Sequence, residues 1–278
     1  MLKILLNRLK PQAEKIIAEE QAGFRAGRST TEQISNLRIR FERYLQHQQN
    51  LYHVFVDFKK VFGRVWHAAL WPTMRMYKIN ANLINIIKQL YDEASSAVYL
   101  NGSIGDWFGT MVGVRQGCLL SPIFFNIFLV RLMTDALEEH NETVSIKGRT
   151  ITNLCFADDI DGLAGKEQEL AKLVERLDTT SAAYDMKISA EKNKLRTNNI
   201  DDINTDIKVN GKKLGTVKNF KYLESVASDK GSKPKILSRI AQTTAAQTKL
   251  RPVWNDRNIE LRSKIRLVIS IFLYACES

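Results

Sequence analysis

Apolar residues recur at helical spacing in four stretches of the chain. Steps of three or four residues between apolar positions are typical of a helix that buries one face. The positions are Ile34, Leu37, Phe41 and Leu45; Leu83, Ile86, Ile87 and Leu90; Phe125, Phe128, Leu129 and Leu132; and Leu170, Leu173, Val174 and Leu177. Ser121-Pro122 supplies an N-cap and a first-turn proline before the third stretch. The pattern therefore predicts four amphipathic helices.

Short runs typical of β-structure lie between these helical stretches. Leu51 to Asp57 is an apolar and β-branched run, which predicts a buried strand ending in a carboxylate. The Asn-Gly pairs at 101–102 and 210–211 each follow a strand-like run and predict tight hairpins. A third hairpin is predicted from Ser145 to Cys155, running into Phe156-Ala157-Asp158-Asp159. Helices mixed with antiparallel hairpins predict an α+β fold.

The length, the apolar content and the net charge of the chain indicate a folded protein and a class of binding partner. With 278 residues and 44% apolar content, the chain can bury a substantial core. Its 41 Lys and Arg against 30 Asp and Glu leave a net charge of +11, and such a surplus attracts polyanions. Nucleic acid is therefore the first partner to consider, although many basic proteins bind none.

Other residue patterns point away from several classes of protein. The three cysteines, Cys118, Cys155 and Cys276, lack CxxC or Cys/His ligand spacing, so we expect reduced thiols and no zinc. The four histidines are scattered and receive no role. No stretch reaches the roughly 18 apolar residues that span a bilayer, and the N-terminus lacks a signal-peptide pattern. We expect no membrane association and a cytoplasmic or nuclear setting; the sequence does not indicate an oligomeric state.

Three carboxylates carry the candidate chemistry. Asp158 and Asp159 are adjacent ionised groups at a turn, and they repel each other unless a cation or solvent neutralises them. An isolated acidic pair is more often an exposed turn, but Asp57 at a strand end supplies a third carboxylate. Mg²⁺ is usually held by one or two carboxylates plus substrate phosphates, and two such ions can drive phosphoryl transfer. The hypothesis is a divalent-metal site.

Four motifs together resemble the reverse-transcriptase domain of non-LTR (LINE-type) retrotransposons. They are residues 21–30 (QAGFRAGRST), which resemble the fingers motif, 56–62 (VDFKKVF, motif A), 113–122 (GVRQGCLLSP, motif B) and 156–159 (FADD, motif C). Their order and spacing match the family over nearly the whole chain. The combination is far more specific than any one motif alone.

The resemblance implies a fold and an activity. The fold would be that of a right-hand polymerase, with partial fingers at 1–50, a ferredoxin-like palm at 51–228 and the start of a thumb at 229–278. The activity would be RNA-directed DNA polymerase, a nucleotidyl transfer to a primer 3′-hydroxyl. The implied cofactors are two Mg²⁺ ions, with Mn²⁺ as an alternative, and the implied partners are an RNA template, a DNA primer and dNTPs.

The resemblance also implies roles at the catalytic centre. Asp57, Asp158 and Asp159 would be the metal ligands and catalytic carboxylates. Lys192 resembles the motif D lysine that protonates pyrophosphate, and an ordinary solvated lysine is an equally good account. Phe62 is similar to the residue that excludes a ribose 2′-hydroxyl by its bulk, although an aromatic residue there could also belong to the core.

Further positions are implied to bind substrate. Arg115, Gln116 and Gly117 would form the loop against the incoming nucleotide and the templating base. Arg25 and Arg28 would pair with phosphate as fork-shaped donors, and the alternative is that they are ordinary surface charges.

The C-terminal part of the match concerns the primer. Tyr222 and Leu223 would belong to the primer grip. Between Lys230 and Arg266 there are ten Lys or Arg and two Asp or Glu, so ten minus two leaves +8. The resemblance places this segment at the thumb side, where template and primer lie. A solvated basic face is the alternative.

Some positions depart from the family pattern. Gly63 replaces an Asp, which costs only a few tenths of a kcal/mol if the position caps a helix. Val61 replaces Ala, and crowding beside Phe62 would cost about 1–3 kcal/mol. Glu224 replaces the glycine of the primer grip and adds negative charge near primer phosphate, and Asp185 replaces another glycine.

The chain also matches the family only from within the fingers to part of the thumb. The expectation is a truncated and mutated copy of a mobile-element polymerase. Three functional hypotheses follow: an active RNA-directed DNA polymerase, an inactive retroelement remnant that only binds nucleic acid, and a chain without present activity.

Overall fold

A five-stranded sheet forms the centre of the computed structural model, which describes residues 1–138, 145–146, 149–150, 152–189, 191–197, 207–209, 211–217, 220–223, 225–227, 233–256 and 258–273. The strand order is β13-β10-β1-β9-β8. The strands are β1 (Tyr52–Val56), β8 (Asn153–Phe156), β9 (Asp159–Ala164), β10 (Lys194–Thr197) and β13 (Gly215–Thr216). β1 pairs antiparallel with β9 and β10, β8 and β9 form a hairpin, and β13 is parallel to β10. The predicted strand after Leu51 is confirmed, as is the α+β class.

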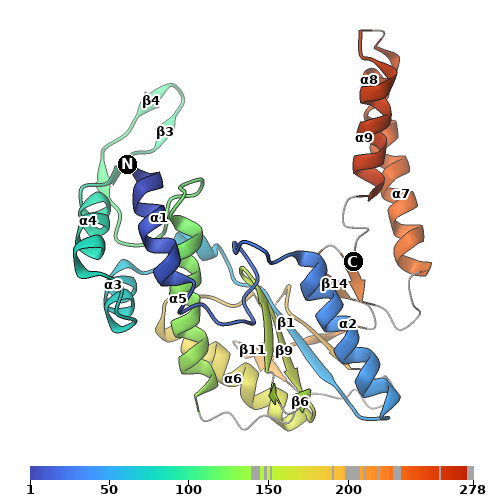
Figure 1. Cartoon of the computed structure of the whole chain (residues 1–278), viewed down its shortest axis with the longest axis horizontal. Coiled ribbons are helices and arrows are strands. Elements are labelled where there is room, and N and C mark those ends of the chain that lie inside the picture. The colour runs from blue at the N-terminus through green and yellow to red at the C-terminus, as the bar shows by residue number, and fades with distance from the viewer. Residues whose placement is uncertain are drawn as a thin grey trace.

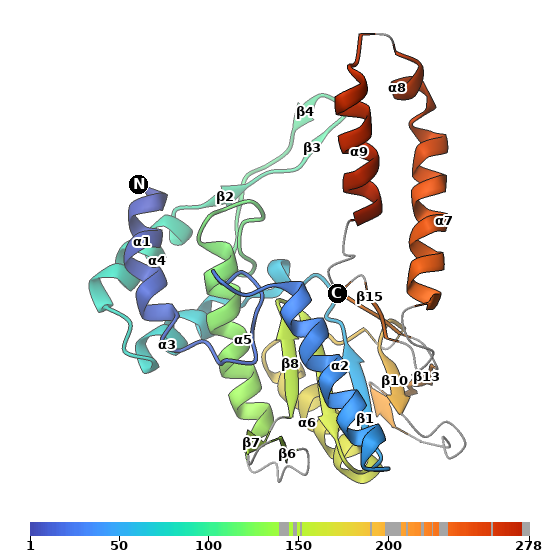
Figure 2. The same ribbon diagram turned by 45° about the vertical axis from the view of Figure 1, so that its right-hand side comes forward.

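Helices cover both faces of this sheet. Figures 1 and 2 show α5 (Ser121–Leu137) and α6 (Glu167–Ala183) on one side and α2 (Thr30–Gln46) on the other. Val54 belongs to the core shared with α5 and α6, whereas its neighbour Phe55 is buried among residues of α2. Since successive strand residues face opposite sides, residues 53–56 of β1 are buried on both faces of the sheet.

A second group of elements packs beside α5. It contains α1 (Leu2–Ala13), the 3₁₀ turn η1 (Val61–Arg64), α3 (His67–Met76) and α4 (Ala81–Asp92). From it projects a ribbon made of β2 (Ser95–Ser96), β3 (Tyr99–Leu100), β4 (Ser103–Ile104) and β5 (Phe108–Gly109). Asn101 and Gly102 turn the ribbon with φ of 50° and 84°, as the Asn-Gly pattern predicted.

Three helices form an arm that stands away from the sheet (Figure 1). They are α7 (Lys233–Lys249), α8 (Arg251–Asn255) and α9 (Leu261–Leu273). Three further hairpins complete the described elements: β6 (Ser145–Ile146) with β7 (Arg149–Thr150), β11 (Lys208–Val209) with β12 (Lys212–Lys213), and β14 (Phe220–Tyr222) with β15 (Ser225–Ala227). The hairpins predicted from 145 and at 210–211 are thus confirmed, with Asn210 itself outside the described residues.

The helical faces were predicted with a few errors. All four apolar positions predicted on α5 and all four on α6 are buried. On α2, Leu45 is exposed; on α4, Ile86 is exposed, and Ile84 and Tyr91 are buried although the pattern did not select them. The N-cap of α5 is Leu120, one residue earlier than predicted. Within the described part of the chain, no helix combines the length and the apolarity needed to cross a membrane.

Candidate active site

The three predicted carboxylates meet at one end of the central sheet. Asp57 directly follows β1, and β1 pairs with β9 in a register that places Phe55 opposite Asp161 and Val56 opposite Ile160. Continued by one residue, the same register places Asp57 beside Asp159, the first residue of β9. Asp158 lies in the turn between β8 and β9. Strand pairing therefore brings together the constellation that the sequence predicted.

The turn that carries Asp158 contains a residue in a strained backbone conformation. Phe156 pairs with Asp159, so only Ala157 and Asp158 connect the two strands. Ala157 has a φ of 57°, in the left-handed region that L-residues rarely adopt. Backbone strain of this kind persists only when the surrounding structure holds it in place.

Burial and mutual repulsion raise the pKa values of two of the carboxylates. Desolvation is the largest cause of the raised pKa of Asp158, followed among the raising causes by the charge of Asp57. The pKa of Asp159 rises to about 6, through desolvation first and then through the charges of Asp158 and Asp57. A cation at this position would relieve both effects.

Lys192 lies at the same site. Its Nζ is 2.7 Å from Oδ2 of Asp57, and the lysine side chain is 69% exposed. The hydrogen bond and the charge of Asp57 raise the pKa of Lys192, so the amine stays cationic. The structure thus brings the predicted motif D lysine to the carboxylates, and its part in proton transfer stays a prediction.

The donor set fits a divalent metal that also binds substrate. Among the described residues, no group of three His, Cys, Asp or Glu side chains is arranged to hold a metal by protein ligands alone. Mg²⁺ does not need such a cage, because it commonly keeps waters and takes substrate phosphates as ligands. Asp57, Asp158 and Asp159 offer hard oxygen donors whose mutual repulsion favours a cation, so they are the residues that would hold it.

Phe62 is held between two other aromatic rings. Its ring centroid is 5.9 Å from that of Phe24, edge to face, and 5.2 Å from that of Phe125 on α5. Its side chain is only partly buried, and its carbonyl accepts a 2.6 Å hydrogen bond from Val114 N. A partly exposed ring backed by packing could serve as a steric gate.

The motif B loop is open to solvent. Arg115, Gln116 and Gly117 are all exposed, and Gly117 has a φ of 84° that suits glycine. The hydroxyl of Ser121 donates a 2.6 Å hydrogen bond to the carbonyl of Arg115, so Ser121 anchors the loop instead of capping α5. The loop is therefore accessible to a substrate, and its predicted role stays a prediction.

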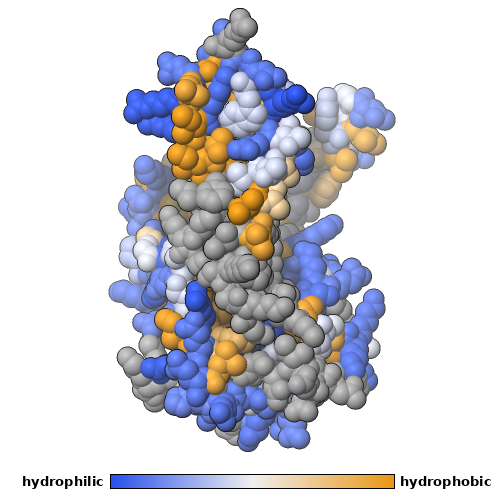
Figure 3. All heavy atoms as spheres, turned by 90° about the vertical axis from the view of Figure 1, so that its right-hand side faces the viewer, coloured by the Kyte–Doolittle hydropathy of each residue, from blue (hydrophilic) through white to orange (hydrophobic). Residues whose placement is uncertain are grey.

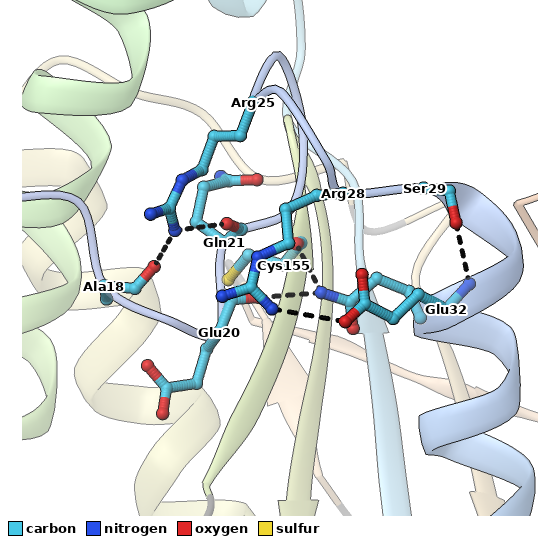
Figure 4. A network of polar contacts seen from close by, with 9 residues as sticks. Ala18, Glu20, Gln21, Arg25, Arg28, Ser29, Glu32 and Cys155 are labelled. Carbon is cyan, nitrogen blue, oxygen red and sulfur yellow. Dashed lines mark hydrogen bonds and ion pairs between the residues drawn. The ribbon is translucent and has the colours of Figure 1, made fainter. Parts of the chain in front are cut away.

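The two predicted phosphate-binding arginines are engaged within the protein (Figure 4). Arg25 contacts Glu14 at 2.9 Å and donates to the carbonyls of Ala18 and Gln21. Arg28 pairs with Glu32 at 3.2 Å and keeps about a third of its side chain exposed. Arg25 thus ties the loop before α2 together, whereas Arg28 is the more accessible of the two.

The predicted primer-grip residues form part of the β14–β15 hairpin. Tyr222 is 3% exposed, its ring is 5.8 Å from that of Phe55, and burial raises its pKa well above the ordinary value. Leu223 lies in the turn with a φ of 46°. Glu224 lies outside the described residues. Tyr222 therefore secures the hairpin to the sheet, and contact with a primer stays a prediction.

The departures from the family have distinct surroundings. Val61 is buried in the main core. Gly63 lies inside η1, and the N-cap of the following helix α3 is Trp66, so Gly63 is not at a helix cap. Asp185 has a φ of 55° and an ion pair with Arg64 at 3.5 Å. A positive φ explains why a glycine is usual at that position.

Three buried polar residues that contact the sheet or its carboxylate-bearing segments were not selected by sequence reasoning. Gln21 and Asn193 hydrogen-bond the backbone of the two carboxylate-bearing segments. His53, which received no role, is fully buried with Nδ1 3.2 Å from the Asp161 carboxylate. Two signals could have directed attention to them: the position of Gln21 at the start of the fingers motif and that of Asn193 directly after Lys192.

A mostly antiparallel sheet that is backed by two helices on one face and carries three carboxylates at one end is the palm of a right-hand polymerase fold. The model of the family "Reverse transcriptase (RNA-dependent DNA polymerase)" matches residues 1–224, and the chain belongs to this family. The resemblance to LINE-type reverse-transcriptase domains is thereby confirmed.

The chain is similar to parts of several curated proteins and solved structures. It is 24% identical to the RNA-directed DNA polymerase from mobile element jockey of Drosophila funebris, over 99% of this chain and 30% of that protein. It is 28% identical to a Pol polyprotein from the type-2 retrotransposable element R2DM of Drosophila melanogaster, over 53% of this chain and 14% of that protein. The chain thus spans less than a third of these curated relatives. An apo telomerase structure from Candida tropicalis has a TM-score of 0.60 at 16% identity, over 82% of this chain and 45% of that one, which shows a shared fold.

Proposed function

We propose that this chain is an RNA-directed DNA polymerase domain that extends a DNA primer with dNTPs along an RNA template. The observation that carries the proposal is the meeting of Asp57, Asp158 and Asp159 at one sheet end, with Lys192 beside them. Family membership supports the same reading. Mutual repulsion among these carboxylates has no evident structural benefit, which favours a catalytic use of the site.

In this reaction the residues of the site would have separate roles. Asp57 and Asp158 would hold the two metal ions, with Asp159 completing the set; Mg²⁺ bound there supplies the charge that activates the 3′-hydroxyl and stabilises pyrophosphate. Lys192, kept cationic by Asp57, would give a proton to the leaving pyrophosphate. Phe62 would exclude a ribose 2′-hydroxyl from the sugar position.

Primer extension tests the proposal. With poly(rA)/oligo(dT), Mg²⁺ and dTTP, the wild-type chain should lengthen the primer, and Asp158→Asn should reduce the rate on the order of 10³-fold or more. Asp92→Asn is the matched control, because it removes an exposed carboxylate on α4 that pairs only loosely with Lys88 at 3.7 Å. Equal extension by the wild type and Asp158→Asn would contradict the proposal.

An inactive remnant that only binds nucleic acid is the competing function. The basic arm favours nucleic-acid binding, because Lys249, Arg251, Arg262 and Arg266 are exposed on it. Binding without any Mg²⁺-dependent extension would support the remnant. The family and the intact carboxylate set favour the polymerase.

A further inference from the structure

The side chain of Gln21 hydrogen-bonds the backbone of the β8–β9 turn, called the catalytic turn below, which carries Asp158. Its Oε1 accepts hydrogen bonds from the N–H groups of Ala157 at 2.8 Å and Gly23 at 2.7 Å. Its Nε2 donates to the carbonyl of Ala157 at 3.0 Å. The side chain is 4% exposed, so water does not compete for these bonds. Both polar groups of Ala157 are thereby fixed at the residue that adopts the left-handed conformation.

The segment that carries Gln21 is itself held in place from three sides. Ala22 N donates to the carbonyl of Cys155, and Cys155 N donates to the carbonyl of Glu20, so the segment lies along β8. Asn126 on α5 donates through Nδ2 to the carbonyl of Gly23 at 3.0 Å. A Cβ on Gly23 would overlap the backbone nitrogen of Ala157. Only glycine permits this approach to the turn.

Asn193 makes a corresponding contact with the other carboxylate-bearing segment. Its Oδ1 accepts a 2.8 Å hydrogen bond from the N–H of Asp57, and its side chain is fully buried. Ser189 N donates to the carbonyl of Asp57 at 2.9 Å. Lys192 directly precedes Asn193, so two neighbouring residues fix the Asp57 backbone and present an amine to its carboxylate.

We infer that Gln21 and Asn193 are paired positioning residues: each uses a buried carboxamide oxygen to fix the main-chain N–H of a segment that carries catalytic carboxylates. The two carboxylate positions come from strands that are about 100 residues apart in the sequence. Strand pairing sets their register, and the two carboxamides set the orientation of the segments beyond the paired residues. The inference rests on the proposed function.

Isosteric substitution separates hydrogen bonding from packing. Gln21→Met keeps the length and the bulk of the side chain and removes its polar atoms. We expect kcat for dTTP incorporation to fall at least tenfold, with KM for dTTP changed less than about threefold, because the carboxylates are misplaced while the nucleotide surface is intact. Asn193→Ala, which removes the carboxamide together with its bulk, should also lower kcat for dTTP incorporation at least tenfold with KM changed less than about threefold. An unchanged kcat in both variants would overturn the inference.

Gln33→Met is the matched control. Gln33 is 3% exposed and its side-chain amide donates to the carbonyls of Glu20 and Cys155, whereas the amide of Gln21 donates to the carbonyl of Ala157. We expect this variant to retain wild-type kcat even if its melting temperature falls as much as that of Gln21→Met. A similar loss of kcat in Gln33→Met would mean that general loosening, not positioning, explains the effect.

Amide hydrogen exchange tests the contacts without any catalysis. Gln21→Met should speed exchange at Ala157 and leave Asp57 protected, and Asn193→Ala should do the reverse. Equal loss of protection at both amides in both variants would overturn the inference. If the wild type fails to extend a primer, the proposed function fails, and this exchange pattern still decides whether the two contacts act locally. If Gln21→Met does not fold, Gln21→Asn, which is one methylene shorter, replaces it.

Discussion

Asp185 and Ala157 share a left-handed backbone for different reasons. Asp185 is the residue after the C-cap of α6: its N–H donates to the carbonyl of Ala182, and the next N–H, of Met186, donates to that of Ser181. This is a Schellman ending, in which glycine is favoured. Ala157 instead lies at the catalytic turn, where Gln21 holds the strained angle. The first strain is incidental to chemistry, and the second belongs to the site.

Relieving the strain at Asp185 should stabilise the protein. Asp185→Gly removes the cost of a left-handed L-residue, about 1 kcal/mol, against the loss of one exposed ion pair with Arg64 that is worth little. We expect the melting temperature to rise by roughly 1–4 °C with primer extension unchanged. A lower melting temperature would show that the ion pair outweighs the strain.

The steric-gate role proposed for Phe62 makes a second prediction. Phe62→Ala should raise incorporation of ribonucleotides relative to deoxynucleotides by roughly tenfold or more. Phe24→Ala should have a smaller effect in the same direction, because Phe24 supports the Phe62 ring from one side. Phe108→Ala removes an exposed aromatic ring from the ribbon and should leave selectivity unchanged. Unaltered selectivity in Phe62→Ala would assign that ring to the core.

The raised pKa of Asp159 predicts how pH and Mg²⁺ interact. The folded chain holds this proton more tightly than the unfolded chain, since the pKa is about 6 against an ordinary 3.8. The contribution of Asp159 to the free energy of unfolding therefore falls as pH rises from about 4 to 6. Mg²⁺ favours the ionised carboxylate, so it should raise the melting temperature more at about pH 7.5 than at about pH 5.

Thermal melts with and without Mg²⁺ at the two pH values check this. In Asp159→Asn, the Mg²⁺-induced rise in melting temperature should be nearly equal at the two pH values, because the Asn side chain cannot ionise. A Mg²⁺-induced shift that is equal at both pH values, or larger at the lower one, would contradict the assignment of Asp159 to the metal site.

Elements with local signals were predictable from the sequence. Apolar periodicity identified the buried faces of α5 and α6, and the Asn-Gly pair identified the ribbon turn. On α4, Tyr91 was missed because it is buried among aromatic rings of α3 and α5, which no local pattern encodes. The contact of Gln21 with Ala157 joins residues 136 positions apart, so it depends on the tertiary structure. The carboxylates were found because motifs preserve their local sequence.

The arm combines basic and apolar side chains on its surface. Figure 3 shows hydrophobic and hydrophilic side chains side by side over the upper part of the molecule, where the arm lies. The exposed apolar residues include Leu261, Ile265 and Ile269, spaced four apart on α9. The basic side chains of the arm are suited to phosphate, which makes the arm the element to test for nucleic-acid contact.

Neutralising the arm should reduce the salt dependence of binding. Replacing Arg251, Arg262 and Arg266 by Gln should weaken binding to single-stranded RNA and lower the slope of log K against log salt by roughly 0.7 for each phosphate that the variant no longer neutralises. Fluorescence anisotropy over a salt series measures both quantities.

A charge-matched control uses the first helix and the segment after it. Replacing Lys3, Arg8 and Lys15 by Gln also removes three positive charges, but from exposed positions on or near α1. The salt slope of this control should stay close to that of the wild type. Equal slopes for the two triple variants would mean that the net charge, and not the arm, determines binding.

At the scale of the whole molecule, the net charge and the sheet topology both bear on nucleic-acid binding. The net charge of +11 attracts a nucleic acid to the molecule, and the sheet brings together carboxylates that would repel it unless metal ions neutralise them. Family membership was predictable because four motifs keep their order along the chain. Catalysis additionally requires that the side chains are held close to a productive geometry, which the motifs alone do not specify.

The most direct measurement is the rate of single-nucleotide incorporation by Asp57→Asn, Asp158→Asn and the double variant on an RNA-templated primer with Mg²⁺. Residues that act as one unit have strongly non-additive effects. We predict that each single substitution reduces the rate on the order of 10³-fold or more, and that the double variant is no slower than the slower single variant. Wild-type rates in the single variants, or losses that simply multiply in the double variant, would contradict a shared metal site.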